Sequence, residues 1–239
     1  MIVQYDGTDF FGWQVQAKGR TVQGDIESAL QKIHLYEKIK LNGSGRTDSG
    51  VHAKGQVASI KIDSLLTGEQ LVKAINRFLE KDVRIMSCTE EDEDFHARFS
   101  AKERQYEYVA VSEQTPFTHM RAWYLKYDVD INLLNKCAEL VVGNHDFTAF
   151  CKANAEVEHK RCIVFESRWK KTSLGLTYYV KANRFLQHMV RFLVGTMVEV
   201  GRGRMTIDDF KLFVGGGHPE LVVVRAPAYG LYLAKVSYV

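Results

Sequence analysis

The sequence predicts an α+β protein made of two related halves. Segments rich in β-branched and aromatic residues alternate along the chain with amphipathic segments of helical period. The two kinds of segment follow a similar order before and after an acidic stretch at residues 90–94, which places the boundary between a first half at 1–97 and a second half at 98–239. This order favours two α+β halves over a parallel doubly wound sheet.

Composition limits the class of protein. With 239 residues, of which 46% are hydrophobic, the chain is long enough to bury a core. A net charge of +3 excludes a strongly basic tail, so any contact with nucleic acid must come from local clusters. The four cysteines show no zinc-ligand spacing, and no stretch approaches the ~20 apolar residues of a membrane span. We therefore expect an unprocessed, soluble, cytoplasmic protein with reduced thiols and no metal.

In the first half, periodicity predicts three strands and two helices. The first helix is indicated by Val22, Ile26 and Leu30, which recur at helical spacing. The second helix is indicated by Thr67 and Gln70, which are spaced as a capping box. The predicted strands are at 1–5, 56–62 and 83–88, and the predicted helices are at 21–34 and 67–79.

The second half repeats the mixture of strands and helices. Tyr106, Tyr108 and Val109 alternate partially within 95–111, which indicates a long strand. Thr206 and Asp209 form a second capping-box pattern. The predicted strands are at 95–111, 123–127, 163–170, 176–182 and 231–238, with the third and fourth as a hairpin, and the predicted helices are at 131–142, 183–200 and 206–213.

A loop at residues 43–53 gathers polar and charged side chains between three glycines. Several glycines in one connection indicate positive φ angles or the close approach of another molecule. Asp48 follows two residues after Arg46, and a cation at that distance keeps a carboxylate ionised, as a nucleophile or base requires. An exposed ion pair between Arg46 and Asp48, worth only about 0–1 kcal/mol, would explain the same pattern without any chemistry.

Two known sequence motifs are similar to this loop, but neither fits it. Asp48-Ser49-Gly50 resembles the signature of aspartic proteases, but the chain has no second copy, and an adjacent arginine opposes the proton sharing between paired acids. The glycines also lack the Gly-Lys-Ser/Thr ending of a phosphate-binding P-loop. We therefore reject both alternatives.

A polar stripe is predicted on the helix at 183–200. Arg184, His188 and Arg191 fall at i, i+4 and i+7, opposite an apolar face. Such a stripe is usually a solvated helix face. However, it carries no acidic residue, so an anion from elsewhere, either Asp48 or a phosphate, is a natural partner.

Cations also precede a strand aromatic at Tyr106, a combination suited to stacking a base while holding an RNA backbone. A strand tyrosine is usually half-buried packing, and this alternative stays open. The positions that could line a groove for RNA are Arg98, Lys102, Arg104, Lys18, Arg20, residues 159–161, Arg168, Lys170, Lys171, Arg202 and Arg204.

Several motifs, in order along the chain, resemble those of TruA-type tRNA pseudouridine synthases. The most specific is Gly45-Arg46-Thr47-Asp48-Ser49-Gly50-Val51-His52-Ala53. The others are Tyr5-Asp6-Gly7-Thr8, Phe11-Gly12-Trp13-Gln14, Gly55-Gln56-Val57, Phe95-His96-Ala97-Arg98-Phe99-Ser100, Tyr106 with Tyr108, His145-Asp146-Phe147, Phe185-Leu186-Gln187-His188-Met189-Val190-Arg191 and Gly230-Leu231-Tyr232-Leu233. The resemblance runs from near residue 3 to near residue 234.

The resemblance implies an isomerase that makes pseudouridine in the anticodon stem-loop of tRNA, at positions 38, 39 and 40. It assigns Asp48 as the catalytic carboxylate, acting on the sugar as nucleophile or base, with Arg46 and Arg191 beside it, and Tyr106 as the residue that stacks on the target base. We expect Arg184 and His188 to contact the substrate. No metal or cofactor is implied.

The implied fold has two ferredoxin-like halves, of the kind also seen in RRM domains, that share a mixed, mainly antiparallel sheet with a central cleft. The implied partners are tRNA and a second copy of the chain in a homodimer.

The sequence departs from the family pattern at two points. Ser49 stands where the family commonly has alanine, which adds a possible hydrogen bond near Asp48. The first strand is also short, which suggests a truncated start. Two other functions stay open: a catalytically silent tRNA-binding or chaperone module on the same fold, and a synthase acting on a different RNA.

Overall fold

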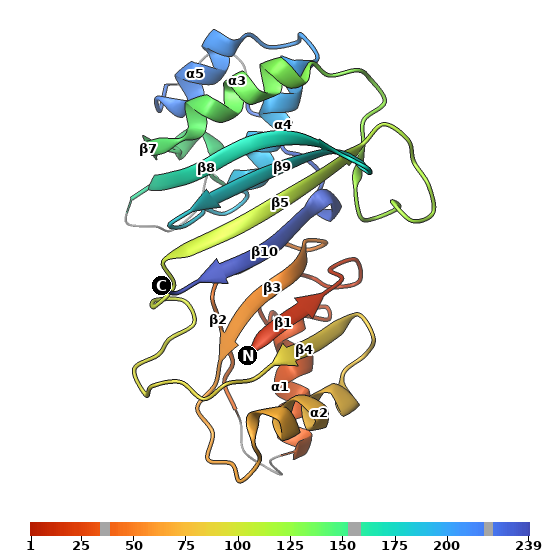
Figure 1. Cartoon of the computed structure of the whole chain (residues 1–239), viewed down its shortest axis with the longest axis vertical. Coiled ribbons are helices and arrows are strands. Elements are labelled where there is room, and N and C mark those ends of the chain that lie inside the picture. Colours follow the sequence, from red (N-terminus) through yellow and green to blue (C-terminus); the bar gives the residue numbers. More distant parts are fainter. Residues whose placement is uncertain (34–38, 153–158, 218–221) are drawn as a thin grey trace. The chain divides into compact units, whose positions relative to one another are not determined.

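The computed structural model describes residues 1–33, 39–152, 159–217 and 222–239. Contacts divide the chain into unit 1, which comprises Met1–Lys102 with Tyr232–Val239, and unit 2, Glu103–Leu231. Each unit contains helices and strands, which confirms the α+β class (Figure 1). The division differs from the predicted boundary at residue 97, and the last strand lies in unit 1 because it pairs there.

The sheet of unit 1 has the strand order β4-β1-β3-β10, and β2 pairs with the end of β3, at Ala58 and Ser59 (Figure 1). The pairs β1–β3, β1–β4 and β2–β3 are antiparallel, and β3–β10 is parallel. The strands are β1 (Ile2–Tyr5), β2 (Asn42–Gly43), β3 (His52–Ser59), β4 (Val83–Ser87) and β10 (Leu231–Ser237).

Two helices complete unit 1 and pack on each other: α1 (Val22–Ile33) and α2 (Gly68–Phe78). α1 buries Val22, Ile26, Ala29 and Leu30, the face that its period predicts. Its predicted end near His34 lies outside the described residues. The predicted capping box of α2 is confirmed, because Thr67 Oγ1 accepts from the amide of Gln70 and the Gln70 side chain accepts from the amide of Thr67.

The sheet of unit 2 has the order β5-β9-β8-β7, with β6 beside β5. All its pairs are antiparallel except β5–β6, so within each unit the predicted mixed, mainly antiparallel pairing is confirmed. A single sheet shared by both halves and a cleft between them stay predictions. The strands are β5 (Glu103–Val111), β6 (Trp123–Tyr124), β7 (Gly143–Asp146), β8 (Arg161–Thr172) and β9 (Gly175–Ala182).

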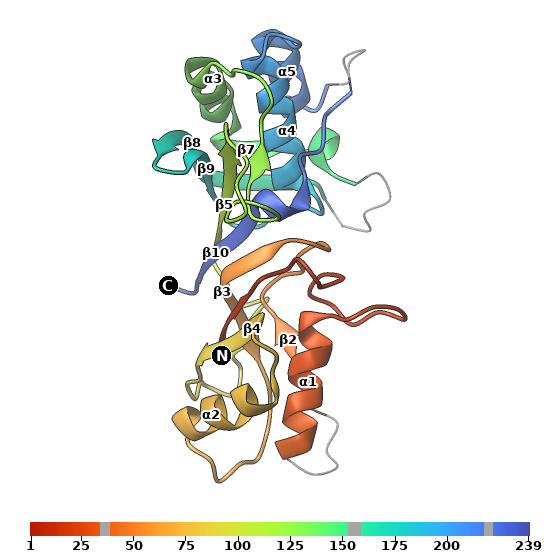
Figure 2. The same cartoon turned by 90° about the vertical axis from the view of Figure 1, so that its right-hand side faces the viewer.

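α4 lies behind the strands of unit 2 in Figure 1, and Figure 2 shows it from the side. The indole N–H of Trp169 in β8 donates to Sδ of Met197 in α4 at 3.3 Å, and both side chains are buried. The helices are α3 (Ile131–Val141), α4 (Met189–Gly201) and α5 (Ile207–Val214), with short 3₁₀ turns at Thr148–Phe150 and Ala228–Gly230. The capping box of α5, formed by Thr206 and Asp209, is confirmed.

The prediction of a helix over 183–200 is wrong at its start. Residues 183–188 are not helical, and α4 begins at Met189. Leu186 is buried, and together with Met189, Val190 and Leu193 it imitates a helical period. His188, the residue before the helix, has φ 66°, in the left-handed region, which interrupts any helix that reaches it.

Two strands also begin elsewhere than predicted. β3 starts at His52, inside the predicted loop, and ends at Ser59, although the β-branched residues are concentrated later. β5 starts at Glu103, and residues 95–102 form turns and irregular chain. Lys102 donates its amide to Ser237 of β10, so this segment ends by bonding to the last strand. Partner strands therefore decided both starts, not local propensity.

Among the described ranges, no helix is long and apolar enough to span a membrane.

We predict that the four thiols of the native protein differ sharply in reactivity. Cys88 is half-buried, whereas Cys137, Cys151 and Cys162 are buried. Burial raises the pKa of Cys137 to about 12 and that of Cys162 to about 11, so few thiolates form there. Iodoacetamide at pH 8, followed by peptide mass spectrometry, should modify Cys88 first and the others only in denaturant. Modification of Cys137 as fast as Cys88 without denaturant would contradict the structure.

Candidate functional site

The loop at residues 43–53 in unit 1 is held from inside by a buried glutamine of β3. Gln56 is fully buried; its Oε1 accepts from Ser44 Oγ at 2.6 Å, and its Nε2 donates to the carbonyl of Gly45 at 3.0 Å. The amide of Ser44 donates to Val57 at 2.8 Å. These bonds satisfy polar groups that have lost water, so the first half of the loop has one defined conformation.

Thr47 is fixed by two bonds from the amino-terminal segment. Its hydroxyl is hydrogen-bonded to that of Tyr5 at 2.8 Å, and its carbonyl accepts from the amide of Trp13 at 3.1 Å. Burial raises the pKa of Tyr5 well above its usual value, and hydrogen bonds with Thr47 and Gln56 lower it only in part. Tyr5 therefore stays protonated and anchors the residue before Asp48.

The backbone after Asp48 is equally constrained. Phe10 accepts at its carbonyl both the Ser49 hydroxyl, at 3.2 Å, and the Gly50 amide, at 3.3 Å. Gly50 has φ 77°, and the amide of Val51 donates back to the backbone carbonyl of Asp48 at 3.1 Å. Ser49 thus adds the hydrogen bond expected near Asp48. Asp48 is half-buried, so its carboxylate is accessible while the backbone that carries it is fixed.

The three glycines of the loop are there for different structural reasons. A Cβ at Gly43 would lie 2.5 Å from the indole of buried Trp13. Gly50 adopts a positive φ. Gly45 has neither constraint: nothing lies within 4 Å of the position its Cβ would take, so the space beside its backbone is open. At Gly45, unlike Gly43, the expected approach of another molecule is compatible with the surroundings.

Arg46 does not form the ion pair considered from the sequence. Its side chain is exposed, and among the described residues it makes no ion pair within 4 Å. An exposed pair gains about 0–1 kcal/mol and orders two side chains, so this result is physically ordinary. A surface ion pair between Arg46 and Asp48 therefore does not account for the loop.

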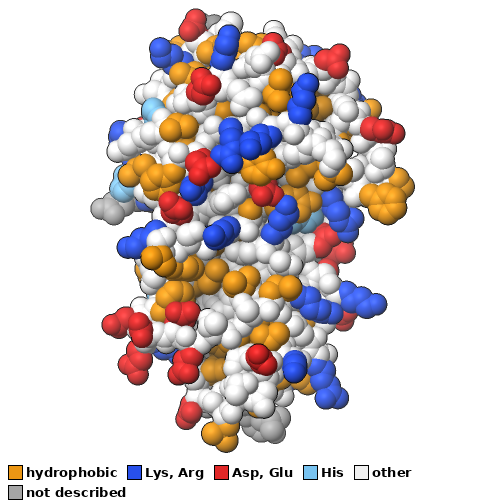
Figure 3. Space-filling model, viewed as in Figure 1, with side chains coloured by type: hydrophobic (Ala, Val, Ile, Leu, Met, Phe, Trp, Pro, Cys, Tyr) orange, Lys and Arg blue, Asp and Glu red, His pale blue; other side chains and the backbone are white. Residues whose placement is uncertain are grey.

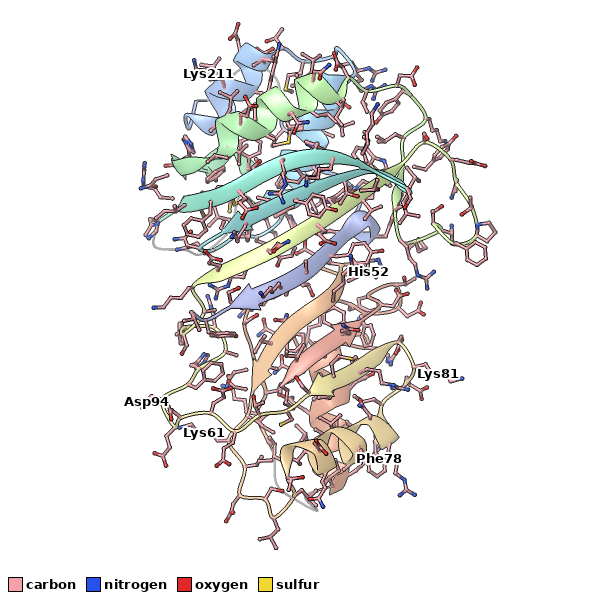
Figure 4. All side chains as sticks on the ribbon, in the orientation of Figure 1. His52, Lys61, Phe78, Lys81, Asp94 and Lys211 are labelled. Carbon is pink, nitrogen blue, oxygen red and sulfur yellow. The ribbon has the colours of Figure 1, made fainter. Side chains whose placement is uncertain are left out.

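His52, at the start of β3 (Figure 4), was expected only as part of the motif around Asp48 and had no predicted role of its own. Its Nδ1 accepts from the amide of Gly7 at 3.0 Å and lies 3.1 Å from Oδ1 of Asp6. The ring stacks on Tyr232 of β10 with centroids 4.7 Å apart, and the ammonium of Lys54 lies 5.1 Å from the Tyr232 ring. His52 thus ties the turn at Asp6 and Gly7 to the strand that leaves the loop.

Tyr106 in unit 2 lies in β5, opposite Val180 of β9. Its side chain is buried, and its ring meets Phe185 edge to face, with centroids 5.1 Å apart and planes at 87°. Phe185 belongs to the non-helical segment before α4, so this segment orients the tyrosine ring.

The predicted stripe of Arg184, His188 and Arg191 is wrong as a helix face, because only Arg191 lies in α4. Arg184 follows β9, and its charge lowers the pKa of the Cys162 thiol against the larger effect of burial. Arg191 donates from Nε to the carbonyl of Ala226 at 2.9 Å. His188 instead accepts at Nδ1 from Nη1 of Arg225, 3.2 Å away.

Arg225 was missed because it lies in irregular chain, where no period distinguishes it. Other cations are paired with acids: Figure 3 shows blue and red side chains together over the strands of unit 2, where Glu166 pairs with Arg168 and Lys181. Arg20 likewise pairs with Asp25 and Asp82, and Arg202 pairs with Glu199. Because acids neutralise these cations, they are the least suited of the predicted groove residues to bind an RNA backbone.

Within the described ranges, no three His, Cys, Asp or Glu side chains are grouped as metal ligands.

Comparison with known proteins gives matches over nearly the whole chain. Residues 1–100 and 137–239 match the family model described as tRNA pseudouridine synthase. A Bacillus pumilus protein named tRNA pseudouridine synthase A is 42% identical, with 99% of this chain and 97% of that protein covered. Proteins of the same name from Chlorobium chlorochromatii and Anoxybacillus flavithermus are 40% and 38% identical, each over 99% of this chain and over 97% and 96% of their own lengths.

We predict opposite tolerances for two glycines of the loop. Gly43→Ala places a methyl group against the rigid Trp13 indole and should lower the free energy of unfolding by about 1–3 kcal/mol. Gly45→Ala meets no neighbour and should change it by less than about 1 kcal/mol. Urea unfolding of both variants measures the difference. Equal destabilisation by the two substitutions would show that the loop is not packed as described.

Proposed function

Because the chain belongs to the tRNA pseudouridine synthase family, we propose that it converts uridine to pseudouridine in the anticodon stem-loop of tRNA, at positions 38, 39 and 40. The observation that carries the proposal is the full-length similarity to relatives of that name, which includes the segment around Asp48. Family membership, with α+β units of mainly antiparallel strands, also agrees with a pseudouridine synthase fold.

The reaction is an isomerisation, so it consumes no second reactant. The bond between N1 of uracil and C1′ of the ribose breaks, a bond between C5 and C1′ forms, and the proton lost from C5 is balanced by one gained at N1. We assign Asp48 as the carboxylate that acts on the sugar, as nucleophile or as base. The fixed backbone on both sides of Asp48 supports this assignment, because a catalytic group needs a defined position.

Five further residues have proposed roles on the substrate. A uridine in a stem must leave its stack before its glycosidic bond can be reached, at a cost of a few kcal/mol. Tyr106 would offset part of this cost by stacking on the base, and its edge-to-face contact with Phe185 holds the ring ready. Arg191 would orient Asp48, and Arg46, whose exposed side chain makes no ion pair among the described residues, would hold the displaced nucleotide beside it. His188, with Arg184, would contact the backbone.

The proposal includes a homodimer, in which two copies hold one tRNA, and a cytoplasmic location. No metal or cofactor takes part in it.

Replacement of Asp48 by alanine should abolish pseudouridine formation in an anticodon-arm transcript. We expect turnover to fall by at least about 10²-fold, the range of a lost acid–base group, while RNA affinity stays within several-fold. Asp63→Ala removes an exposed carboxylate from the same unit and serves as the matched control. Tritium release from 5-³H-uridine RNA measures turnover, and fluorescence anisotropy measures affinity.

Retained turnover in Asp48→Ala would defeat the assignment of the carboxylate. A wild-type protein that binds the transcript without releasing tritium would instead support a silent tRNA-binding module. Release from other RNAs but not from tRNA would redirect the proposal to another substrate.

For Tyr106 we predict that the ring matters more than the hydroxyl. Tyr106→Phe keeps the aromatic face and should retain most of the single-turnover rate. Tyr106→Leu loses base stacking, worth about 1–3 kcal/mol, and should lower the rate more than the affinity. Single-turnover assays at saturating RNA separate the two effects. An unchanged rate in Tyr106→Leu would remove the stacking role.

A further inference from the structure

The segment that precedes β10 is fastened along α4. The amide of Val224 donates to Oγ1 of Thr196 at 3.1 Å, and the amide of Ala226 donates to the carbonyl of Arg191 at 3.0 Å. In turn, Nε of Arg191 donates a hydrogen bond to the carbonyl of Ala226 at 2.9 Å. A Cβ on Gly195 would lie 2.1 Å from the carbonyl oxygen of Val224, so the segment lies directly on the helix. The backbone at residue 225 is thus fixed on both sides.

The side chain of Arg225 is exposed but braced. Its Nη1 lies 3.2 Å from Nδ1 of His188. A guanidinium has only donors, so Nδ1 is the acceptor, and the neutral imidazole carries its proton on Nε2. The imidazole therefore holds the guanidinium of Arg225 from one side.

His188 is positioned for this contact and not for capping its own helix. It is the residue before α4, with φ 66°, and its side chain makes no capping hydrogen bond. A left-handed conformation is uncommon outside glycine and persists where the surroundings enforce it. At this position the ring reaches Arg225 and packs near Phe192, with centroids 6.1 Å apart.

The charge of Arg225 is not neutralised by the part of the chain that the structure describes: no carboxylate there forms an ion pair with it within 4 Å. Arg191 lies beside it, bonded to the next residue, and adds a second positive charge. An exposed guanidinium that no described carboxylate neutralises favours an anion, and RNA phosphates are the anions that a tRNA substrate supplies.

We propose that Arg225, braced by His188, binds a backbone phosphate of the RNA at or next to the target nucleotide. The placement follows from the segment before α4, in which Phe185 contacts Tyr106 and His188 contacts Arg225. Three residues span at most about 10 Å, so the phosphate contact lies close to the ring proposed to stack on the base. This inference rests on the proposed function.

The test compares Arg225→Ala and Arg225→Gln with wild type on an anticodon-arm transcript. Glutamine keeps an N–H donor for His188 and removes the charge. If Arg225→Ala folds poorly, Arg225→Gln alone decides the result. We expect Kd to rise roughly tenfold in both variants, as for one charged hydrogen bond. The slope of log Kd against log salt should fall by about 0.7–0.9, and the single-turnover rate at saturating RNA should stay within a few-fold.

Lys211→Ala is the charge-matched control, because Lys211 is exposed on α5 of the same unit (Figure 4). It should leave both Kd and the salt slope unchanged. A double variant with His188→Ala should cost less than the sum of the two single variants, since His188 acts on the phosphate through Arg225.

The outcomes separate the two levels of the argument. If wild type forms no pseudouridine in any transcript, the proposed function fails. If wild type is active and Arg225→Gln binds with the wild-type Kd and salt slope, the phosphate contact is overturned and the function stands. An equal effect of Lys211→Ala would also overturn it, because the change would then reflect net charge alone.

Discussion

The hydrogen bond between the buried hydroxyls of Tyr5 and Thr47 couples the first strand to the loop that carries Asp48. Thr47 precedes Asp48, and its carbonyl is also bonded to the amide of Trp13, so the position of the carboxylate depends on the amino-terminal segment. Loss of the Tyr5 hydroxyl would take this hydrogen bond from the buried Thr47 hydroxyl, at a cost of about 1–3 kcal/mol. The catalytic assignment therefore requires a correctly folded first strand and turn as well as the loop itself.

Local signals predicted the fold where they operate within a few residues. The capping boxes at Thr67 and Thr206 are such signals, and both helices begin where these residues place them. The start of α4 was wrong because apolar spacing continues through Leu186 into irregular chain. Strand starts failed for a different reason: β3 is extended to His52 by pairing with β1 and β10, and no pattern within the strand records its partners.

The candidate site was predictable in its chemistry and not in its supports. The concentration of charged residues and glycines around Asp48 was visible in the sequence, but the buried Gln56 that holds the loop and the ring of His52 were not, because their roles depend on distant partners. Arg225 was hidden for the same reason: its neighbour His188 is 37 positions away in the chain. Conversely, adjacency suggested a pairing of Arg46 with Asp48 that the exposed arginine does not make.

The parallel pairing of β10 with β3 has a consequence for how the protein is made. The ribosome delivers residues 1–102 first and must then translate all of unit 2 before the partner strand emerges. At ~5–20 residues per second this delay is on the order of 10 s. Throughout that time the edge of β3 lacks its partner, and an uncovered edge invites pairing with another chain. The nascent protein thus carries this uncovered part of the β3 edge until late in synthesis, when the segment around Asp48 has long left the ribosome.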